Sequence, residues 1–386
     1  MLEWKSIGTI CSNVFAGGTP STKHLEYYDG TIPWIRSGEI DFNVITKAER
    51  NITELGYKNS SAKKIRPNSV VMAMTGATVA KSAVVEIETT ANQSVCAMET
   101  DESVVNYKYL FYYLAEEYFA IKSSAQGALT SLNLAMIKQI QIPIPSLAEQ
   151  TRIVGILDTF TASIENLKQQ IAQRHKQYEH YRDQLLDLEG KERVEMKALG
   201  EVVASNCSLS YGIVQPGDDV INGIPVVRPV DLITTYVKLD GLKRTTIQIS
   251  NSYKRTILEG NEILFCVRGT TGIMGLATNE LKGCNVTRGI VPISFDDETT
   301  KKFVYYQLKS YRLQKTIEEK TNGTALRQIN IKDLRLLNLR MPSLTEQQRI
   351  VSILDTFEAS IANLEQQLAQ RERQYEYYRN KLLMFE

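Results

Sequence analysis

The chain has 386 residues, with 45 basic and 44 acidic side chains and a formal net charge of +1. This length allows two domains of about 140 residues, each large enough to bury a core. No apolar run is long enough to cross a bilayer, and no signal peptide is recognised. The five cysteines are scattered and form no C-x-x-C pair, which argues against a disulfide framework or a zinc site. We therefore expect a cytoplasmic protein that is not bound to a membrane.

The chain contains two globular segments that are diverged copies of one another, residues 1–142 and 191–340. They share four short matches at shifts of 192 to 194: Trp4–Gly8 with Met196–Gly200, Ile32–Ile40 with Ile224–Leu232, Val70–Thr78 with Ile263–Thr271, and Lys108–Leu114 with Lys302–Leu308. Short runs rich in β-branched residues predict strands at Ser69–Met74, Val226–Val230 and Glu262–Val267. Helices are predicted at Tyr107–Lys122 and Thr300–Glu319. Each segment is predicted to be an α+β domain with a twisted or partly closed sheet and its own set of loops.

Two helical segments, residues 143–190 and 341–386, are nearly identical. The stretch Pro145–Glu189 returns at Pro342–Glu386 without a gap, and 31 of the 45 aligned positions are the same. In each copy, apolar or ring-bearing residues recur with a 3.5-residue period for more than four heptads, a pattern typical of a coiled coil. We call this line of recurring residues the seam. Its extent predicts helices of about 33 residues, or roughly 50 Å. The alternative is a pair of ordinary long core helices.

The order domain, helix, domain, helix predicts how the two helices pair. The first helix ends where the second domain begins, so the simplest packing is an antiparallel intramolecular coiled coil with pseudo-two-fold symmetry. Aromatic residues near the end of each helix should then approach the start of the other helix. These residues are Tyr178 and Tyr181 in the first helix and Tyr375 and Tyr378 in the second. Arg174 and Arg371 are polar positions in the seam that would fix its register.

No pattern for catalysis or for a metal is found. The stretch Gly76–Ser82 resembles a phosphate-binding loop, but Lys81 stands where the second glycine is required. The chain has three histidines, and two of them, His175 and His180, lie on the first helical repeat, where a solvated face explains them. We predict a non-catalytic chain without a metal site or a bound cofactor.

Charge gives only a weak indication of the ligand. Residues 191–340 contain 22 basic and 16 acidic side chains, whereas residues 1–142 contain 13 and 14. Nucleic-acid binders usually show a stronger basic footprint. Either DNA is not the ligand, or each domain binds through a local basic face and partner proteins supply further phosphate contacts. A solvated surface of mixed charge is the plain alternative.

The chain resembles the specificity subunits of type I restriction-modification systems. The resemblance rests on two divergent domains that alternate with two near-identical helices, and on two motifs in each helix, EQxRIVxILDxF at Glu149–Phe160 and Glu346–Phe357 and YxxYRxxLL at Tyr178–Leu186 and Tyr375–Leu383. It covers essentially the whole chain.

The resemblance implies a recognition subunit. Each domain would be a target recognition domain for one half of a bipartite site in double-stranded DNA. The helices would set the spacer and dock two methyltransferase subunits, which carry S-adenosylmethionine, and restriction subunits would join the complex with ATP and Mg²⁺. Two readers on one face of DNA must lie about 34–36 Å apart, and a roughly 50 Å rod is of the right order.

Candidate contacts with DNA are basic and hydroxyl side chains near turns. In the second domain we predict Arg228, Lys243, Arg244, Lys254, Arg268, Thr270, Arg288 and Arg327. In the first we predict Arg36, Lys63, Lys64, Thr75, Lys81 and Thr130. Two alternatives stay open: Arg36 and Arg228, which are paired across the repeat, belong to a shared structural element, and Lys63 and Lys64 are merely solvated.

Candidate contacts with the methyltransferase subunits lie on the helices, away from the seam: Glu149, Arg152, Asp158, Glu346, Arg349 and Asp355. The alternative for Asp158 and Asp355 is a salt bridge within their own helix.

Two other functions of the chain remain possible on the sequence alone. One is a single-chain methyltransferase or nuclease, which the missing motifs disfavour, and the other is a coiled-coil scaffold that presents two protein-binding domains.

Overall fold

The computed structural model describes residues 2–125, 131–323 and 327–385 and divides the chain into two compact units. The first unit contains residues 1–168 and 366–386, and the second contains residues 169–365. The division cuts both long helices. Each unit therefore holds one globular domain, the beginning of one long helix and the end of the other.

The long helices are α6 (Leu147–Leu186) and α12 (Leu344–Leu383), of 40 residues each. They start two residues after Pro145 and Pro342 and are longer than the 33 residues of the seam. The added turns lie at the beginning, where the Ser146 and Ser343 hydroxyls accept the backbone N–H groups of residues three positions later, at 3.3 and 3.4 Å. These first turns are helical because they are capped, and they contribute no seam residue.

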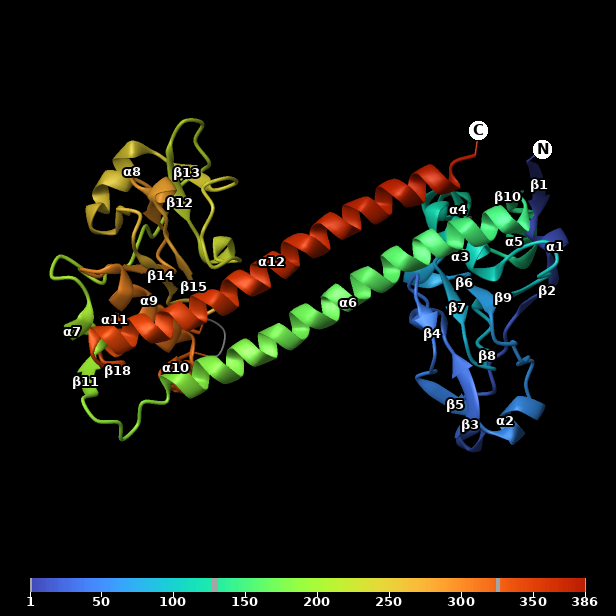
Figure 1. Cartoon of the computed structure of the whole chain (residues 1–386), viewed down its shortest axis with the longest axis horizontal. Coiled ribbons are helices and arrows are strands. Elements are labelled where there is room, and N and C mark those ends of the chain that lie inside the picture. Colours follow the sequence, from blue (N-terminus) through green and yellow to red (C-terminus); the bar gives the residue numbers. More distant parts are fainter. Residues whose placement is uncertain (1, 126–130, 324–326, 386) are drawn as a thin grey trace. The chain divides into compact units, whose positions relative to one another are not determined.

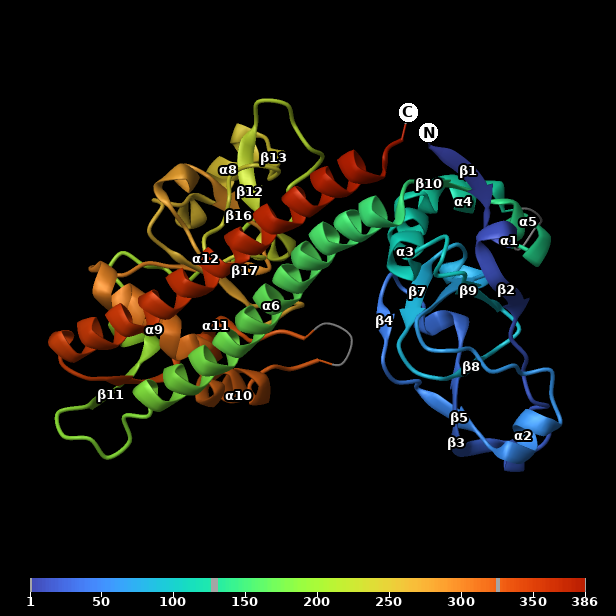
Figure 2. The same cartoon turned by 45° about the vertical axis from the view of Figure 1, so that its right-hand side comes forward.

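The helices pair antiparallel within the first unit. Figures 1 and 2 show the beginning of α6 beside the end of α12 over the first domain. The Phe160 ring stacks on Tyr378 with centroids 5.3 Å apart and lies 6.5 Å from Tyr375. The Arg371 guanidinium lies 5.6 Å from the centre of the Phe160 ring. A residue near the start of one helix thus meets residues near the end of the other.

The second unit repeats this arrangement with the helices exchanged. Phe357, near the start of α12, stacks on Tyr181 at 5.5 Å and lies 6.5 Å from Tyr178, while the Arg174 guanidinium is 5.9 Å from its ring centre. The predicted aromatic contacts and antiparallel pairing are therefore confirmed in both units. The seam arginines lie against aromatic faces, a contact worth about 0.5–1 kcal/mol at an exposed site.

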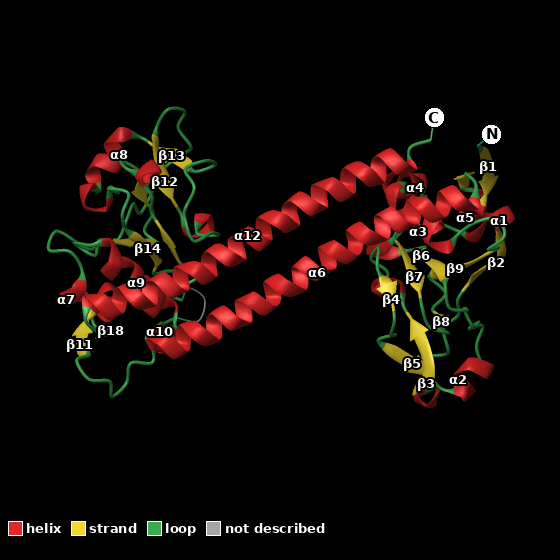
Figure 3. Ribbon diagram, viewed as in Figure 1, coloured by secondary structure: helices red, strands yellow, loops and turns green. Residues whose placement is uncertain are grey.

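Among its described residues the first domain has three sheets and five short α-helices; Figure 3 shows this mixture of strands and helices. Its main sheet has the order β2–β9–β6–β7–β4, with strands Cys11–Ala16, Val95–Thr100, Ser69–Ala73, Ser82–Val85 and Val44–Ile45. A smaller sheet has the order β5–β3–β8, with strands Arg50–Ile52, Tyr28–Ile35 and Thr90–Ala91, and β1 (Glu3–Ser6) pairs with β10 (Gln141–Ile144). The helices are α1 (Ile7–Ile10), α2 (Glu54–Lys58), α3 (Tyr107–Glu116), α4 (Tyr118–Ser124) and α5 (Leu134–Gln139).

The second domain keeps this framework, with fewer strands among its described residues. The order β15–β14–β17 (Met274–Leu276, Ile263–Cys266, Ile290–Ile293) corresponds to β7–β6–β9, and β13–β12–β16 (Lys243–Thr245, Ile224–Val227, Asn285–Val286) to β5–β3–β8. β11 (Glu195–Ala198) pairs with β18 (Asn338–Met341), as β1 does with β10. Its helices are α7 (Leu199–Val202), α8 (Ile247–Ser252), α9 (Glu298–Lys309), α10 (Tyr311–Glu319) and α11 (Ile331–Arg335). The predicted α+β class and shared framework are confirmed.

Each predicted domain helix is in fact two helices. The stretch expected at Tyr107–Lys122 is α3 and α4, and the stretch at Thr300–Glu319 is α9 and α10. In the second domain the break lies at Ser310, whose extended backbone ends α9 and whose hydroxyl accepts the N–H of Leu313 at 3.4 Å. A serine that caps a helix can begin a new one where apolar periodicity alone predicts continuity.

The cores of the domains extend onto the long helices. Ile153 and Leu157 of α6 are buried in one cluster with Tyr109 and Leu110 of α3, and Leu354 of α12 is buried with Tyr306 of α9. All five cysteines are free thiols. Within the described ranges no helix is both long and apolar enough to cross a membrane.

Candidate nucleic-acid interface

The central strand of each domain ends in a loop that leads back along a neighbouring strand. In the first domain the Ala73 N–H donates to Lys81 O and the Ala80 N–H to Ala73 O, both at 2.9 Å. In the second the Cys266 N–H donates to Ile273 O at 2.8 Å, and the N–H of the residue before Ile273 returns to Cys266 O at 2.9 Å. We call residues 74–81 and 267–273 the hairpin loops. They share a backbone frame and differ in side chains.

A glycine turns the chain in each hairpin loop. Gly76 has φ +80° and Gly269 has φ +86°, and a Cβ atom at either position would meet nothing within 4 Å. The left-handed backbone, rather than crowding, therefore favours glycine here. The match between Gly76 and Gly269 in the sequence marks the same turn in both domains.

The second hairpin loop brings three predicted residues together. The Gly269 N–H donates to Arg327 O at 2.9 Å, and the Thr271 hydroxyl donates to the same oxygen at 3.2 Å. Arg268 pairs with Gln328 in an antiparallel bridge. Arg268, Thr270 and Arg327 therefore lie at one end of β14, although Arg327 is some sixty residues away in the chain.

A hollow of about 570 Å³ lies beside this loop, against α10. Its lining includes Thr270, Arg327, Gln314, Lys315 and Glu318. The Arg327 guanidinium pairs with Glu318 at 3.1 Å, and its side chain is 53% exposed. The sequence reasoning missed Lys315. The helical spacing in α10 could have indicated it. Leu313 and Ile317 are buried, and this spacing turns Tyr311, Lys315 and Glu318 to the other face of the helix.

The other basic residues predicted for the second domain lie elsewhere. Arg288 is exposed just before β17, where the next residue accepts the N–H of Val267, so it stands near the hairpin loop. Lys243 and Arg244 belong to β13 in the other sheet, and the Arg244 guanidinium donates to Gly223 O at 3.0 Å. Lys254 is exposed in a short turn after α8.

Arg36 and Arg228 each begin an equivalent turn. The Arg36 N–H donates to Glu39 Oε1 and the Arg228 N–H to Asp231 Oδ2, both at 2.8 Å. The Arg228 guanidinium also donates to both Asp231 oxygens, at 3.0 and 2.7 Å, and this pairing raises its pKa. These contacts support the alternative of a shared structural element, although a role in binding DNA stays a prediction.

The remaining candidates of the first domain are spread over its surface. Thr75 and Lys81 lie in the hairpin loop, where Lys81 pairs with Asp41 and its ammonium is 5.8 Å from the Phe42 ring centre. The Lys63 ammonium lies 5.4 Å from the ring centre of Phe15, and the Lys64 ammonium donates to Glu88 at 2.7 Å. Both lysines are nevertheless exposed, so the alternative of a solvated pair stays open beside a role in binding DNA. Thr130 lies outside the described residues.

Two predicted partner contacts recur at the start of each long helix. The Arg152 guanidinium donates to Glu149 at 2.8 and 2.6 Å, and that of Arg349 to Glu346 at 2.7 Å twice. These hydrogen bonds hold the pKa of both glutamates below the ordinary value. In both pairs the arginine is exposed and the glutamate half-buried, and the geometry matches, so both helices offer the same surface feature.

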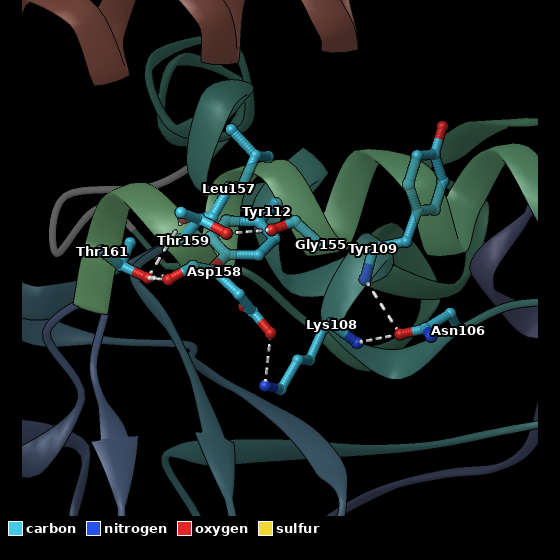
Figure 4. A network of polar contacts seen from close by, with 9 residues as sticks. All are labelled: Asn106, Lys108, Tyr109, Tyr112, Gly155, Leu157, Asp158, Thr159 and Thr161. Atoms are coloured by element: carbon cyan, nitrogen blue, oxygen red, sulfur yellow. Dashed lines mark hydrogen bonds and ion pairs between the residues drawn. The ribbon is translucent and has the colours of Figure 1, made fainter. Parts of the chain in front are cut away.

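Asp158 and Asp355 instead join the long helices to the domains. Asp158 accepts the Lys108 ammonium and the Tyr112 hydroxyl, each at 2.7 Å (Figure 4). Asp355 accepts the Lys302 ammonium and the Tyr306 hydroxyl, each at 2.6 Å. The alternative of a salt bridge within the same helix is wrong for both, because the partners lie on α3 and α9. We call these two groups of three residues the clamps.

The clamps are half-buried, and this affects their tyrosines. The side chains of Lys108 and Asp158 are 31% and 36% exposed, and those of Lys302 and Asp355 are 20% and 37% exposed. Burial, together with the neighbouring aspartate, raises the pKa of Tyr112 and of Tyr306. Both hydroxyls therefore stay protonated and able to donate at neutral pH.

The sequence matches the family described as "Type I restriction modification DNA specificity domain" over residues 1–174 and 191–373. It is 26% identical to the EcoBI specificity subunit of Escherichia coli over 305 residues, which is 72% of this chain and 64% of that protein. It is 34% identical to the EcoR124I/EcoR124II specificity subunit of E. coli over 204 residues, half of each chain. The chain thus spans between half and about two thirds of these relatives.

A relative from Haemophilus influenzae, the putative specificity subunit S.HindORF215P, is 30% identical over 312 residues and 76% of both chains. Solved structures share the fold. A chain of a type I restriction-modification system superposes with a TM-score of 0.65 at 20% identity, covering 99% of this chain and 96% of that one. The S subunit from M. genitalium gives 0.62 at 15%, covering 100% and 97%. With both halves of the sequence matched, the chain belongs to the family of type I restriction-modification DNA specificity domains.

Proposed function

We propose that this chain is the DNA-reading subunit of a type I restriction-modification complex, in which each domain reads one half of a bipartite site. The observation that carries the proposal is the pair of hairpin loops. Their backbone hydrogen bonds and turning glycines coincide, while their side chains differ: Lys81 in one loop corresponds to Ile273 in the other. A constant frame with variable side chains is what two readers of different sequences need.

The second hairpin loop is suited to a polyanion. Arg268, Arg327 and Lys315 gather there around the exposed Thr270, on a domain with an excess of basic residues. Guanidinium groups bind phosphate oxygens and guanine edges by paired hydrogen bonds. In our proposal Arg327 exchanges its exposed ion pair with Glu318 for such a contact.

The long helices set the spacer between the half-sites and dock two methyltransferase subunits. The matching pairs Glu149–Arg152 and Glu346–Arg349 support two equal docking positions, because one partner surface would fit both. Catalysis then belongs to the partners. S-adenosylmethionine binds to the methyltransferase subunits, and ATP and Mg²⁺ to the restriction subunits that complete the complex in the cytoplasm.

The test is selection of DNA by the full chain together with its methyltransferase partner. A library of random duplexes is bound, recovered and sequenced. We expect two short conserved blocks separated by a spacer of constant length. Selection of unrelated sequences would contradict the proposal and favour a scaffold with two protein-binding domains.

A matched pair of variants then assigns the half-sites. Arg327→Ala should weaken binding and relax one block only, by about 1–3 kcal/mol if the guanidinium contacts a base. Lys81→Ala should act on the other block or not at all. If both variants relaxed the same block, the two domains would not read separate half-sites.

A further inference from the structure

The most informative feature outside the hairpin loops is the pair of clamps. Each clamp takes two residues from a divergent domain and one from a near-identical helix. The lysine and tyrosine are four residues apart on α3 (Lys108, Tyr112) and on α9 (Lys302, Tyr306), which places both on one helix face. The same three residue types meet in both units although the surrounding domain residues have changed.

The other polar attachments between domain and helix differ from unit to unit. In the first unit the Asn106 N–H donates to the Gln150 side chain, and Arg379 pairs with Glu116. In the second unit Lys309 pairs with Glu358. The backbone N–H of Tyr311 also donates to Asp183 there, at 3.0 Å. The clamps are thus present in both units, whereas these other contacts between domain and helix differ between the units.

Stability alone is a weak reason for such retention. The carboxylates are more than a third exposed, and partly exposed ion pairs contribute little to folding. The buried apolar residues Leu157 and Leu354 already attach the helices to the domain cores. Apolar packing has no preferred direction, however, so it fixes the orientation of a domain less strictly than hydrogen bonds do.

The geometry of a clamp does fix an orientation. In the first unit Asp158 Oδ2 binds the lysine and Oδ1 the tyrosine, one helical turn apart (Figure 4). Two contacts at different heights on α3 fix its rotation about its own axis as well as its distance from α6. Asp355 presents its oxygens to α9 in the same way, and Figure 2 shows α9 beside α12.

The orientation is passed on to the hairpin loop. α3 packs on β6 and β7, the two strands that the first hairpin loop connects. In the second domain Phe303 and Tyr306 of α9 share a buried cluster with Ile263 and Phe265 of β14. A rotation of α3 or α9 would therefore turn the loop as well.

We infer that the clamps are positioning elements, which hold each hairpin loop at a fixed angle to its long helix and so make binding depend on the exact spacer between half-sites. This inference rests on the proposed function. The aspartates touch no DNA; they act through α3 and α9. Removing a clamp leaves a domain that still reads its half-site but tolerates a wrong spacer.

The experiment uses the full chain with its methyltransferase partner and duplexes carrying the selected half-sites. The spacer is the selected one, one base pair shorter or one base pair longer. The variants are Asp158→Asn, Asp355→Asn and Tyr306→Phe. We expect the ratio of dissociation constants between wrong and correct spacers to fall by about three- to tenfold, the equivalent of one charge-assisted hydrogen bond. Binding to a duplex with a single half-site should stay unchanged.

Two controls separate positioning from stability. Thr356→Ala, next to Asp355 on the same helix, removes only an exposed hydroxyl that donates to Ser352 O at 2.8 Å; it does not touch the clamp and should keep the ratio. Lys302→Arg keeps a cation near Asp355 and should retain more of the ratio than Lys302→Met. A melting temperature measured for every variant identifies any that unfold, and Tyr112→Phe and Tyr306→Phe are the mild changes that keep the test valid.

The outcomes are distinct. If the variants weaken binding to all spacers equally, the clamps are only structural and the inference is wrong. If the wild-type chain selects no bipartite site, the proposed function fails and the inference fails with it. A loss of spacer discrimination at unchanged half-site affinity supports both.

Discussion

The two units attach nearly the same helical sequence to domains that have diverged, and the attachments show which contacts belong to the helix and which to the domain. Gln150 and Gln347 are equivalent and buried, at 0% and 6% exposure. Gln150 accepts the Asn106 N–H at 2.8 Å and donates to two carbonyl oxygens. Gln347 donates to Pro342 O at 2.9 Å, while its Oε1 has no partner among the described residues.

The domain causes this difference. α9 begins at Glu298, where Asp297 accepts the Thr300 N–H at 2.8 Å. α3 begins later relative to the clamp lysine, so the N–H of its capping residue, Asn106, is directed to Gln150. An identical side chain is therefore satisfied in one unit and not in the other. A repeated sequence guarantees a repeated helix but not repeated contacts.

The largest effect is expected where the units are most alike. Leu157 and Leu354 are fully buried in equivalent positions, so Leu157→Ala and Leu354→Ala should each lower the free energy of unfolding of their own unit by about 2–5 kcal/mol. Both tryptophans, Trp4 and Trp34, lie in the first unit, so fluorescence in a urea titration follows that unit alone. Hydrogen exchange measured by mass spectrometry follows the second.

Equal shifts of the Trp34 fluorescence transition by both leucine variants would contradict this prediction. They would show that the units unfold together rather than separately. A conservative change on the same helix, Leu157→Met, is the control, because it keeps the volume and should cost less than about 1.5 kcal/mol.

Substitution of the two equivalent glutamines should lower the free energy of unfolding by different amounts in the two units. Gln150→Ala removes three hydrogen bonds and leaves the half-buried Asn106 N–H unpaired, which should cost about 2–3 kcal/mol. Gln347→Ala removes one hydrogen bond and should cost about 1 kcal/mol. Urea titrations read by fluorescence for the first unit and by hydrogen exchange for the second give both values. Equal costs would mean that Gln347 Oε1 is satisfied in solution.

Glu358 and Thr161 occupy equivalent helix positions with different tasks. Glu358 accepts the Tyr178 hydroxyl at 3.1 Å and pairs with Lys309 at 3.3 Å, whereas Thr161 has only a 3.4 Å contact with Tyr112 toward its domain. Glu358→Thr should therefore cost about 1–2 kcal/mol. Thr161→Ala should cost a few tenths. Hydrogen exchange in α9 and α3 measures the two effects.

The pH dependence of the Glu358 effect follows from Lys309. Burial lowers the pKa of Lys309, but Tyr305 and Glu358 together raise it above 10.5. Its contribution is therefore fully present below 10.5 and is lost as the pH rises through the folded-state pKa. Glu358→Thr should flatten this alkaline loss of stability. An unchanged pH profile of unfolding would contradict the assigned pairing.

The smallest effect on stability is expected at the exposed pairs. Glu149→Gln and Glu346→Gln should change the free energy of unfolding by less than about 0.5 kcal/mol, since exposed ion pairs in helices contribute little. Because the pKa of each glutamate is lowered, the small contribution exists above pH 4.5 and disappears in acid. If these variants nonetheless fail to coelute with the methyltransferase partner, the docking prediction is supported; unchanged coelution would contradict it.

Local patterns in the sequence were enough for much of the fold. The 3.5-residue period of the repeat predicts α6 and α12 and the approach of Tyr178, Tyr181, Tyr375 and Tyr378 to the start of the other helix, because helix and coiled-coil signals depend only on spacing along the chain. The chain order predicts antiparallel pairing. The strand runs around β6 and β14 were placed within a residue or two.

The candidate site was only partly predictable. Arg268, Thr270 and Arg327 were named singly, but nothing in their spacing shows that Gly269 donates to Arg327 O and brings them together. The role of Asp158 was also not visible, since its charge suggests a solvated face and its partners lie about fifty residues earlier. Contacts between distant segments depend on packing, which single positions do not encode. The domain limits and the individual DNA contacts stay predictions.

The sequence by itself determined that the chain contains one unit repeated twice, with long helices and divergent α+β domains, because repeats and periodicity are properties of the order of residues. Only the tertiary structure decided that a lysine and a tyrosine of each domain meet an aspartate of a long helix, and that the hairpin loops share one frame. These features arise from hydrogen bonds whose direction and partner are set once the cores have packed.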